Sequence, residues 1–452
     1  MKAINPATNE LIKDYDEHDE SAVKDILKKV DNEFKSWRNT DFAHRSKLMN
    51  KAAEILKKNK DDYARTMAME MGKPVAEARA EVEKCAWVCE YYAENAEKFL
   101  ADMEIETDAS RSFVAFQPLG TVLAIMPWNF PFWQVFRFAA PALMAGNTGV
   151  LKHASNVPGS ALKIEEVFQE AGFPENAFRT LLIGSSKVEA VIKDERVKAV
   201  TLTGSEPAGM KVAAVSGSVL KKTVLELGGS DPYIVLEDAD MPACVQTAVK
   251  ARMINNGQSC IAAKRFIVVK SKLKEFEEAQ TNIMKNLKVG DPLDEDTQAG
   301  PMARQDLLDE LHEQVMQSVE KGAKVLTGGE PMDSEGAFYP PTILTNCKRG
   351  MKVVDEETFG PVSAIIPVKD AEEAITVAND SDLGLGGAVW SQDVEKAIEV
   401  ARRVETGNMF VNGMTKSDPR LPFGGVKKSG YGRELSVFGI REFVNIKTVW
   451  VG

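Results

Sequence analysis

Three short blocks of the sequence carry side chains that together could attack a carbonyl group. The block NNGQSC at 255–260 places the thiol of Cys260 just after a glycine-containing turn, among small polar neighbours. In ELGG at 226–229, Glu226 ends an apolar run, and in PWNFP at 127–131, Asn129 lies between two prolines. A thiol can act as a nucleophile, an amide can hold an oxyanion and a carboxylate can activate water.

Each of these residues also has an ordinary structural explanation when it is taken alone. A single cysteine is more often an inert core residue, a glutamate beside glycines is usually solvated, and an asparagine between prolines often belongs to a turn. The sequence has no GxSxG motif, and no histidine lies in a local motif with Cys260. A papain-like hydrolase, in which a histidine activates the cysteine, is therefore a remote alternative. The sequence favours a scheme in which Cys260 is the nucleophile and Glu226 is the base.

Taken together, the three blocks resemble motifs of the aldehyde dehydrogenase superfamily, and they occur in the same order as in that family. Two further blocks of that family are present, EETFGP at 356–361 and PFGG at 422–425. The resemblance implies an α/β fold with two Rossmann-like lobes and a small β oligomerisation element. It also implies that Cys260 is the nucleophile, that Asn129 and the Cys260 backbone N–H hold the oxyanion, and that Glu226 activates the water that hydrolyses a thioester.

A candidate phosphate-binding turn lies at 203–209, with the sequence TGSEPAG after an apolar strand and at the start of a helix. Backbone N–H groups at such a helix start suit a phosphate, but an ordinary strand-to-helix turn explains the pattern equally well. The spacing approaches a P-loop, yet Met210 stands where the lysine should be, which argues against a kinase or NTPase.

The family resemblance implies that this turn is part of a complete dinucleotide-binding site. It implies phosphate contacts at Gly204 and Ser205 and a ribose contact at Lys152. The nicotinamide end would lie near Trp128, Leu227, Glu357 and Phe359.

One departure from the family bears on the choice of dinucleotide. Where NAD-preferring members usually carry Lys-Pro-Ala-Glu, this chain has Lys152-His153-Ala154-Ser155. A glutamate would accept hydrogen bonds from the ribose diol and repel a 2′-phosphate, whereas Ser155 removes that charge. We therefore expect NADP in preference to NAD, with His153 either a donor at the cofactor or a packing residue.

The substrate-binding residues are predicted from two positions. Arg137 occupies a position where succinate-semialdehyde dehydrogenases carry arginine, which suits a substrate carboxylate, although a structural salt bridge is the alternative. Ser417, in the segment before PFGG, is a second candidate contact, and Arg420 a weaker one. Ile254 stands where some of these enzymes have a second arginine, so a single or differently built clamp is expected. Use of a broader range of aldehydes is the alternative.

The bulk properties agree with an intracellular enzyme of this size. The chain has 452 residues and a formal net charge of −11, with lysine and arginine dispersed, which argues against nucleic acid or an anionic membrane as a partner. Five cysteines predict reduced thiols, and four histidines without zinc spacing predict no metal site. The N-terminus lacks a signal-peptide core, so we expect a cytoplasmic location.

Strands alternate with helices in two regions, 147–226 and after Cys260, which predicts parallel sheets. We expect a cofactor-binding domain at 1–100 and 127–228, a catalytic domain at 229–430, and an oligomerisation element at 101–126 and 431–452. The apolar segments 112–117 and 121–126 are predicted to pair as a hairpin. The resemblance implies a homodimer or homotetramer.

Two other functions fit the same fold. A non-catalytic structural protein, as some lens crystallins are, would not need the three catalytic side chains. An acylating dehydrogenase would pass the thioester to coenzyme A, whereas Glu226 favours water as the acceptor.

Overall fold

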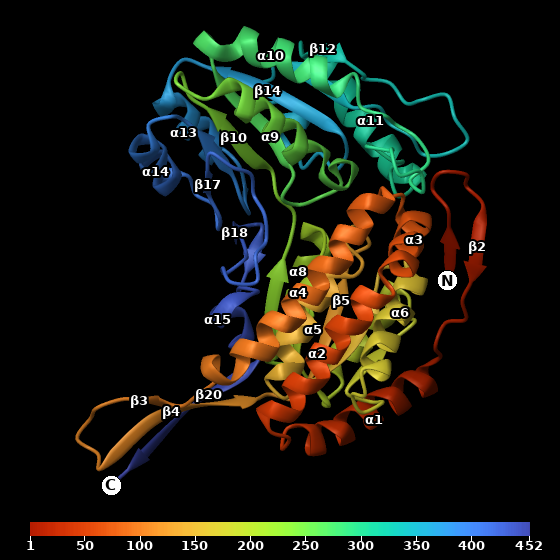
Figure 1. Ribbon diagram of the computed structural model, residues 1–452, viewed down its shortest axis with the longest axis vertical. Helices are drawn as coiled ribbons and strands as arrows, with labels where there is room; N and C mark the ends of the chain where they lie inside the picture. The colour runs from red at the N-terminus through yellow and green to blue at the C-terminus, as the bar shows by residue number, and fades with distance from the viewer.

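The computed structural model describes residues 1–452, and the alternating segments between 121 and 226 form the first of two large sheets (Figure 1). Its strand order is β19-β9-β8-β5-β6-β7, parallel throughout except for β19. The strands are β5 (Thr121–Met126), β6 (Thr148–His153), β7 (Phe178–Thr180), β8 (Val197–Thr203), β9 (Lys222–Glu226) and β19 (Gly430–Tyr431). Every residue of β6 is buried, as expected for a parallel strand that is covered on both faces.

The helices of this lobe cover the two faces of the sheet in two groups. The core on one face combines α2 to α6, and the core on the other combines α1, α7 and α8. The bounds are α1 (Glu20–Trp37), α2 (Phe42–Lys58), α3 (Lys60–Met71), α4 (Val75–Phe99), α5 (Trp133–Met144), α6 (Pro158–Glu170), η1 (Ser185–Lys187), α7 (Val188–Lys193) and α8 (Glu206–Ser218). The predicted alternation of strands and helices between 147 and 226 is therefore confirmed.

The second lobe holds a seven-stranded sheet of order β12-β13-β14-β11-β10-β16-β17, parallel except for β12. Its strands are β10 (Asp231–Val235), β11 (Ala263–Val269), β12 (Lys324–Thr327), β13 (Thr342–Thr345), β14 (Val362–Val368), β16 (Ala388–Trp390) and β17 (Phe410–Val411). Its helices are α9 (Met241–Met253), η2 (Ile254–Gly257), α10 (Lys270–Met284), α11 (Gln305–Glu320), α12 (Lys352–Asp355), α13 (Ala371–Asn379) and α14 (Val394–Arg403). The strand pattern did not reveal β10, which begins with Asp231 and Pro232, residues that strands usually avoid.

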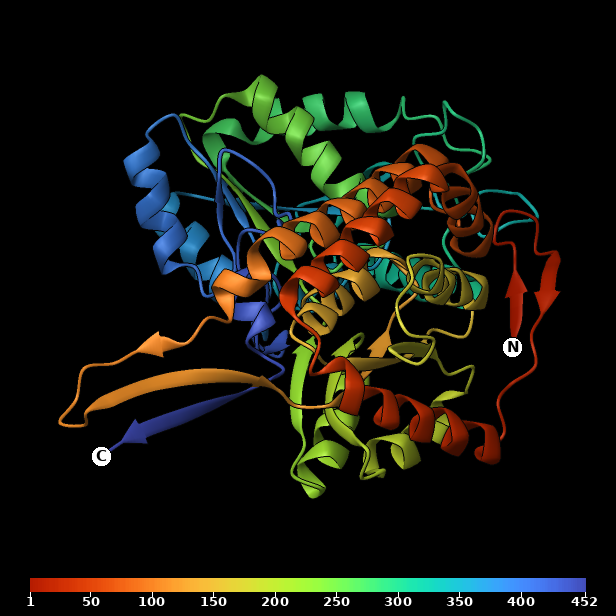
Figure 2. The same ribbon diagram turned by 60° about the horizontal axis from the view of Figure 1, so that its bottom comes forward.

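A narrow three-stranded sheet projects from the body of the molecule, with the C-terminus at its tip (Figures 1 and 2). It pairs β4 (Arg111–Pro118) with β3 (Met103–Glu104) on one side and β20 (Val444–Val451) on the other, all antiparallel. We call this sheet the arm. The predicted hairpin between 112–117 and 121–126 is wrong, because β5 lies at the centre of the first sheet. Residues 121–126 therefore belong with the first lobe and not with the arm.

Short elements complete the chain. They are β1 (Lys2–Ile4), β2 (Leu11–Asp14), β15 (Leu383–Gly384), β18 (Val426–Lys427) and α15 (Ser436–Ile440). None of the helices combines the length with the apolar run that crossing a membrane requires.

Strand order in the first sheet locates a ligand site. After β5 the chain adds β6 and β7 on one side and then returns to add β8 on the other side of β5. Loops at the carboxyl ends of β5 and β8 therefore diverge, and ligands of open parallel sheets bind in the crevice that such a reversal creates. The PWNFP block follows β5 and the Gly204 turn follows β8, so both lie at this crevice.

Candidate active site

The candidate residues come from facing edges of the two sheets. Asn129 and Gly204 follow strands of the first sheet, and Glu226 ends its strand β9. Cys260 and Glu357, in contrast, precede strands β11 and β14 of the second sheet. The carboxyl edge of one sheet thus meets the amino edge of the other, which is how residues so distant in sequence come to line one cleft.

The nucleophile loop is held in a conformation that few residues adopt. Asn255 and Asn256 have φ values of 54° and 56°, in the left-handed region that asparagine tolerates better than most residues. Asn256 Nδ2 donates to the Gly72 carbonyl at 2.9 Å. Gly257 has a φ of 74°, and a Cβ there would lie 2.3 Å from the Gly360 carbonyl oxygen. The NNG sequence thus has a structural reason: it allows a tight turn packed directly against the EETFGP block.

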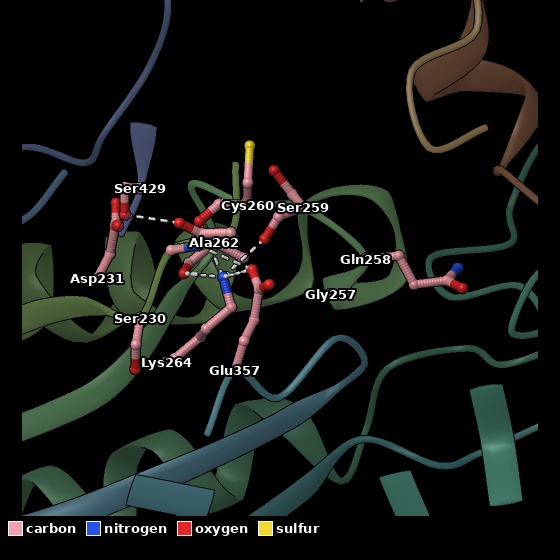
Figure 3. A network of polar contacts seen from close by, with 12 residues as sticks. Ser230, Asp231, Gly257, Gln258, Ser259, Cys260, Ala262, Lys264, Glu357 and Ser429 are labelled. Atoms are coloured by element: carbon pink, nitrogen blue, oxygen red, sulfur yellow. Dashed lines mark hydrogen bonds and ion pairs between the residues drawn. The ribbon is translucent and has the colours of Figure 1, made fainter. Parts of the chain in front are cut away.

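A buried lysine fixes the backbone on both sides of the nucleophile (Figure 3). Lys264 Nζ donates to the carbonyl oxygens of Ser259 at 2.8 Å and Cys260 at 2.9 Å, and it lies 3.4 Å from Glu357 Oε1. The Cys260 sulfur points away from this ammonium (Figure 3). Lys264 therefore fixes the backbone carbonyl groups of Ser259 and Cys260. Because this backbone is fixed, the Cys260 side chain points into the cleft.

The Cys260 thiol lies where two cavities meet, and it lines both of them. The surrounding protein excludes water and raises the pKa of the thiol to about 12, while the positive charges of Lys264 and Arg137 oppose this shift. The thiol is therefore protonated at neutral pH in the free protein. The other four cysteines are buried, as expected for core residues.

Asn129 lies beside the thiol with an amide that has spare hydrogen-bonding capacity. Its side chain is 4% exposed, and its Nδ2 donates to the Gln258 carbonyl at 3.2 Å. Asn255 Nδ2 in turn donates to the Asn129 carbonyl at 2.7 Å, which ties the two loops together. Because an amide nitrogen carries two hydrogens, one remains for an oxyanion formed next to Cys260.

Glu226 is buried without a hydrogen-bond partner for either carboxylate oxygen. Burial and the neighbouring Glu434 carboxylate raise its pKa well above the ordinary value, against the opposing charges of Arg137 and Arg433. A Cβ at Gly424, in the PFGG block, would lie 2.7 Å from Glu226 Oε1. An unpaired, desolvated carboxyl group is costly for stability and is typical of a proton-transfer residue.

The larger cavity, of about 720 Å³, fits a dinucleotide. Most of the residues predicted from the resemblance line it: Trp128, Asn129, Lys152, Gly204, Ser205, Leu227, Glu357 and Phe359. Ser205 caps helix α8 but uses no side-chain hydrogen bond for this, so its hydroxyl and the first helical N–H groups are available to a phosphate. A Cβ at Gly228 would lie 2.4 Å from Glu357 Oε2, which explains why the ELGG block needs a glycine there.

Two predicted cofactor residues do not line this cavity. His153 is buried, with Nε2 2.9 Å from the Pro131 carbonyl and Nδ1 accepting from the Ala154 N–H at 2.9 Å. Burial lowers its pKa to about 4, so the ring is uncharged at neutral pH. Ser155 is exposed on the turn after β6, next to Ala154, which does line the cavity. The geometry favours the packing explanation for His153 and leaves Ser155 at the rim.

The smaller cavity, of about 310 Å³, contains Arg137 and Ser417. Arg137 is 2% exposed; its Nε forms an ion pair with Glu434, and its Nη2 donates to Thr203 Oγ1 at 3.3 Å. The salt bridge that was the structural alternative for Arg137 is therefore present, with Glu434 as its partner. The Arg137 side chain also faces the smaller cavity. Ser417 Oγ accepts from Lys84 Nζ at 2.8 Å.

Sequence reasoning missed a charged stripe on helix α4. Glu77, Glu81 and Lys84 all line the smaller cavity, at a spacing of four and then three residues that puts them on one helix face. Glu77 accepts from the Asn255 N–H at 2.7 Å, which supports the left-handed turn. Glu81 accepts from the first N–H groups of α5, those of Phe132 and Trp133, at 2.9 Å each. Charged residues at helical spacing between apolar ones were the available signal.

Comparison with known proteins extends the assignment to the whole chain. The model of the aldehyde dehydrogenase family matches residues 1–449. A probable succinate-semialdehyde dehydrogenase [NADP(+)] of Synechocystis sp. is 53% identical over 451 residues, which is 100% of this chain and 99% of the relative. The succinate-semialdehyde dehydrogenase [NADP(+)] of Mycobacterium avium is 50% identical over 456 residues, covering 100% of this chain and 97% of the relative.

Solved structures give the same picture. The crystal structure of succinic semialdehyde dehydrogenase from Streptococcus pyogenes, in complex with NADP+, superposes with a TM-score of 0.98 at 40% identity. The match covers 100% of this chain and 99% of that one.

Proposed function

Because the chain belongs to the aldehyde dehydrogenase family, we propose that it oxidises succinate semialdehyde to succinate and transfers the hydride to NADP. The observation that carries this proposal is the position of Cys260, whose side chain lines both the dinucleotide cavity and the smaller, cation-lined cavity. A nucleophile at that junction can hold an aldehyde from one side while the hydride leaves towards the other. The names of the relatives support the same substrate and cofactor.

The residues support a two-stage reaction. The Cys260 thiol first releases its proton to solvent. The resulting thiolate forms a C–S bond to the aldehyde carbon, and the carbonyl electrons move to an oxyanion held by Asn129 Nδ2 and the Cys260 N–H. A bound oxidised nicotinamide, held near Trp128, Leu227, Glu357 and Phe359, would supply the acceptor for a hydride from that carbon. The oxyanion then re-forms the C=O bond and leaves a thioester on Cys260. Glu226 takes a proton from water as the water attacks, the C–S bond breaks, and the carboxylate product leaves.

The substrate proposal is tested by comparing two four-carbon aldehydes. With NADP, we expect kcat/KM for succinate semialdehyde to exceed that for butanal by at least about tenfold, because only the first carries a carboxylate that the cations of the smaller cavity can bind. The growth of reduced-nicotinamide absorbance measures both rates. Equal kcat/KM values would instead support the broad-specificity alternative.

The preference for NADP rests on Lys152 and Ser155. Lys152 lines the dinucleotide cavity, and Ser155 on the adjacent turn leaves its rim without a carboxylate. We expect Ser155→Glu to raise the KM for NADP by about tenfold or more, because the new carboxylate repels a 2′-phosphate, and to lower the KM for NAD. Ser155→Ala is the matched control and should keep the preference for NADP. An unchanged preference in Ser155→Glu would contradict this role.

The arm supports assembly into a homodimer or homotetramer. Strand β20 is at the edge of its sheet, and Ile446 and Trp450, on the same face of that strand, are 63% and 56% exposed. An exposed, apolar edge strand is suited to pairing with a second copy. We expect the double variant Ile446→Lys/Trp450→Lys to reduce the mass measured by light scattering towards the 49.6 kDa of one chain. An unchanged oligomeric mass would place the interface elsewhere.

A further inference from the structure

The smaller cavity holds a cation that no carboxylate neutralises. Lys84, on helix α4, lines this cavity together with Arg137 and Ser417. Its Nζ donates to Ser417 Oγ at 2.8 Å and lies 4.2 Å from the centre of the Trp133 ring. It forms no ion pair with any residue of the chain.

The carboxylates around Lys84 are each bound to another group. Glu81 pairs with Lys73 and accepts two backbone N–H groups at the start of α5. Asp418 pairs with Arg420 at 2.7 Å. The carboxylate of Glu434 pairs with Arg137 and not with Lys84.

We infer that Lys84, oriented by Ser417, is a further residue that binds the distal carboxylate of the substrate, beside Arg137 in the same cavity. This inference rests on the proposed function, because it assigns one end of the proposed substrate to a residue. It also accounts for Ile254, which lines the same cavity at the position where some succinate-semialdehyde dehydrogenases carry a second arginine. A single carboxylate at the end of a short aliphatic tail is the chemistry that this ammonium would recognise.

The environment of Lys84 makes the pairing favourable when the substrate arrives. Burial, and then the positive charge of Arg137, lower the pKa of the Lys84 ammonium to about 8. A carboxylate entering the cavity restores a counter-charge to a partly desolvated cation, where an ion pair is stronger than at the surface. The groups that face Lys84 are Glu81 and Cys85 on its own helix, Arg137 on α5 and Asp418 in the loop before PFGG.

The test compares succinate semialdehyde with butanal in Lys84→Met, which keeps the length of the side chain and removes its charge. We expect the KM for succinate semialdehyde to rise by about 10- to 100-fold with a much smaller change in kcat, as for the loss of one charge-assisted contact. For butanal we expect kcat/KM to increase, because the apolar methionine suits an uncharged tail. Lys84→Arg should restore most of the affinity for succinate semialdehyde.

Three further measurements separate binding from a structural role. Lys98→Met makes the same change of charge at an exposed position of helix α4 and should leave the KM for both aldehydes as in the wild type. Succinate, as a competitive inhibitor, should bind at least about tenfold more weakly to Lys84→Met than to the wild type. The wild-type KM for succinate semialdehyde should also rise above pH 8, as the ammonium loses its proton, but not in Lys84→Arg.

The outcomes distinguish this inference from the proposed function. If the wild type does not prefer succinate semialdehyde to butanal, the proposed substrate is wrong and the role of Lys84 is wrong with it. If the wild type does prefer it and Lys84→Met keeps that preference, only the inference is overturned. Equal losses with both aldehydes in Lys84→Met would likewise overturn it, since they would indicate general damage to the site.

Discussion

Glu226→Gln is expected to stop the enzyme after a single turnover. Attack by Cys260 and hydride transfer do not require the Glu226 carboxylate, so one equivalent of reduced cofactor should form rapidly per active site. Hydrolysis of the thioester then lacks its base, and we expect steady-state turnover to fall by about 10²- to 10⁴-fold. Stopped-flow absorbance measures the burst, and intact-mass spectrometry should detect the acyl group on Cys260.

The replacement itself is well suited to the site. Neither oxygen of Glu226 has a hydrogen-bond partner, and burial raises its pKa, which favours the neutral carboxyl form. Glutamine is neutral and of similar size, so the fold should be kept. Hydroxylamine, a nucleophile that needs no general base, should restore product release. If Glu226→Gln loses turnover and also shows no burst of reduced cofactor, Glu226 acts before hydride transfer and not in hydrolysis.

The raised pKa of Glu226 also predicts how the rate of thioester hydrolysis depends on pH. Because Glu226 must be ionised to act as a base and burial raises its pKa, hydrolysis should accelerate as the pH rises. Addition of coenzyme A at constant pH tests the acylating alternative. An absolute requirement for it would mean that a thiol, and not water, is the acceptor.

Sequence patterns predicted the parallel sheets well because their strands and helices are locally distinct. The strands β6, β8, β11 and β14 are apolar runs bounded by turns or charged helices, and each lies in a region where alternating strands and helices were expected. The pairing of β4 could not be predicted in this way. Its partner β20 lies more than 300 residues later in the chain, and only the family resemblance placed the two segments in one element.

The sequence predicted the site residues that would take part in the chemistry. It did not predict the residues that hold other residues in place. Cys260, Asn129 and Glu226 lie in short motifs of unusual composition. Lys264 and Lys84, in contrast, are single lysines within helix or strand patterns, and only the three-dimensional structure reveals the partners that explain their burial. The balance of charge around Arg137 likewise depends on Glu434, which lies in a loop almost 300 residues away.

Cys260→Ala is expected to abolish oxidation of every aldehyde, by about 10⁴-fold or more, as is typical when a covalent nucleophile is removed. Binding of NADP should remain, because the phosphate and ribose contacts come from other residues of the cavity. Absorbance assays and a direct titration of NADP binding check the two parts. Residual turnover above about 1% of the wild type would argue against a thioester intermediate.

The thiol also offers a measurement that does not depend on turnover. Burial holds the pKa of the Cys260 thiol well above neutral pH, so the thiolate is a minor species at pH 7 in the free protein. Alkylation by iodoacetamide should therefore accelerate by about tenfold for each pH unit between 7 and 9, since the thiolate is the reactive form. The reaction should be absent in Cys260→Ala, because the other cysteines are buried. A rate that is already constant near neutral pH would mean that nearby positive charges outweigh desolvation and that the thiolate is preformed.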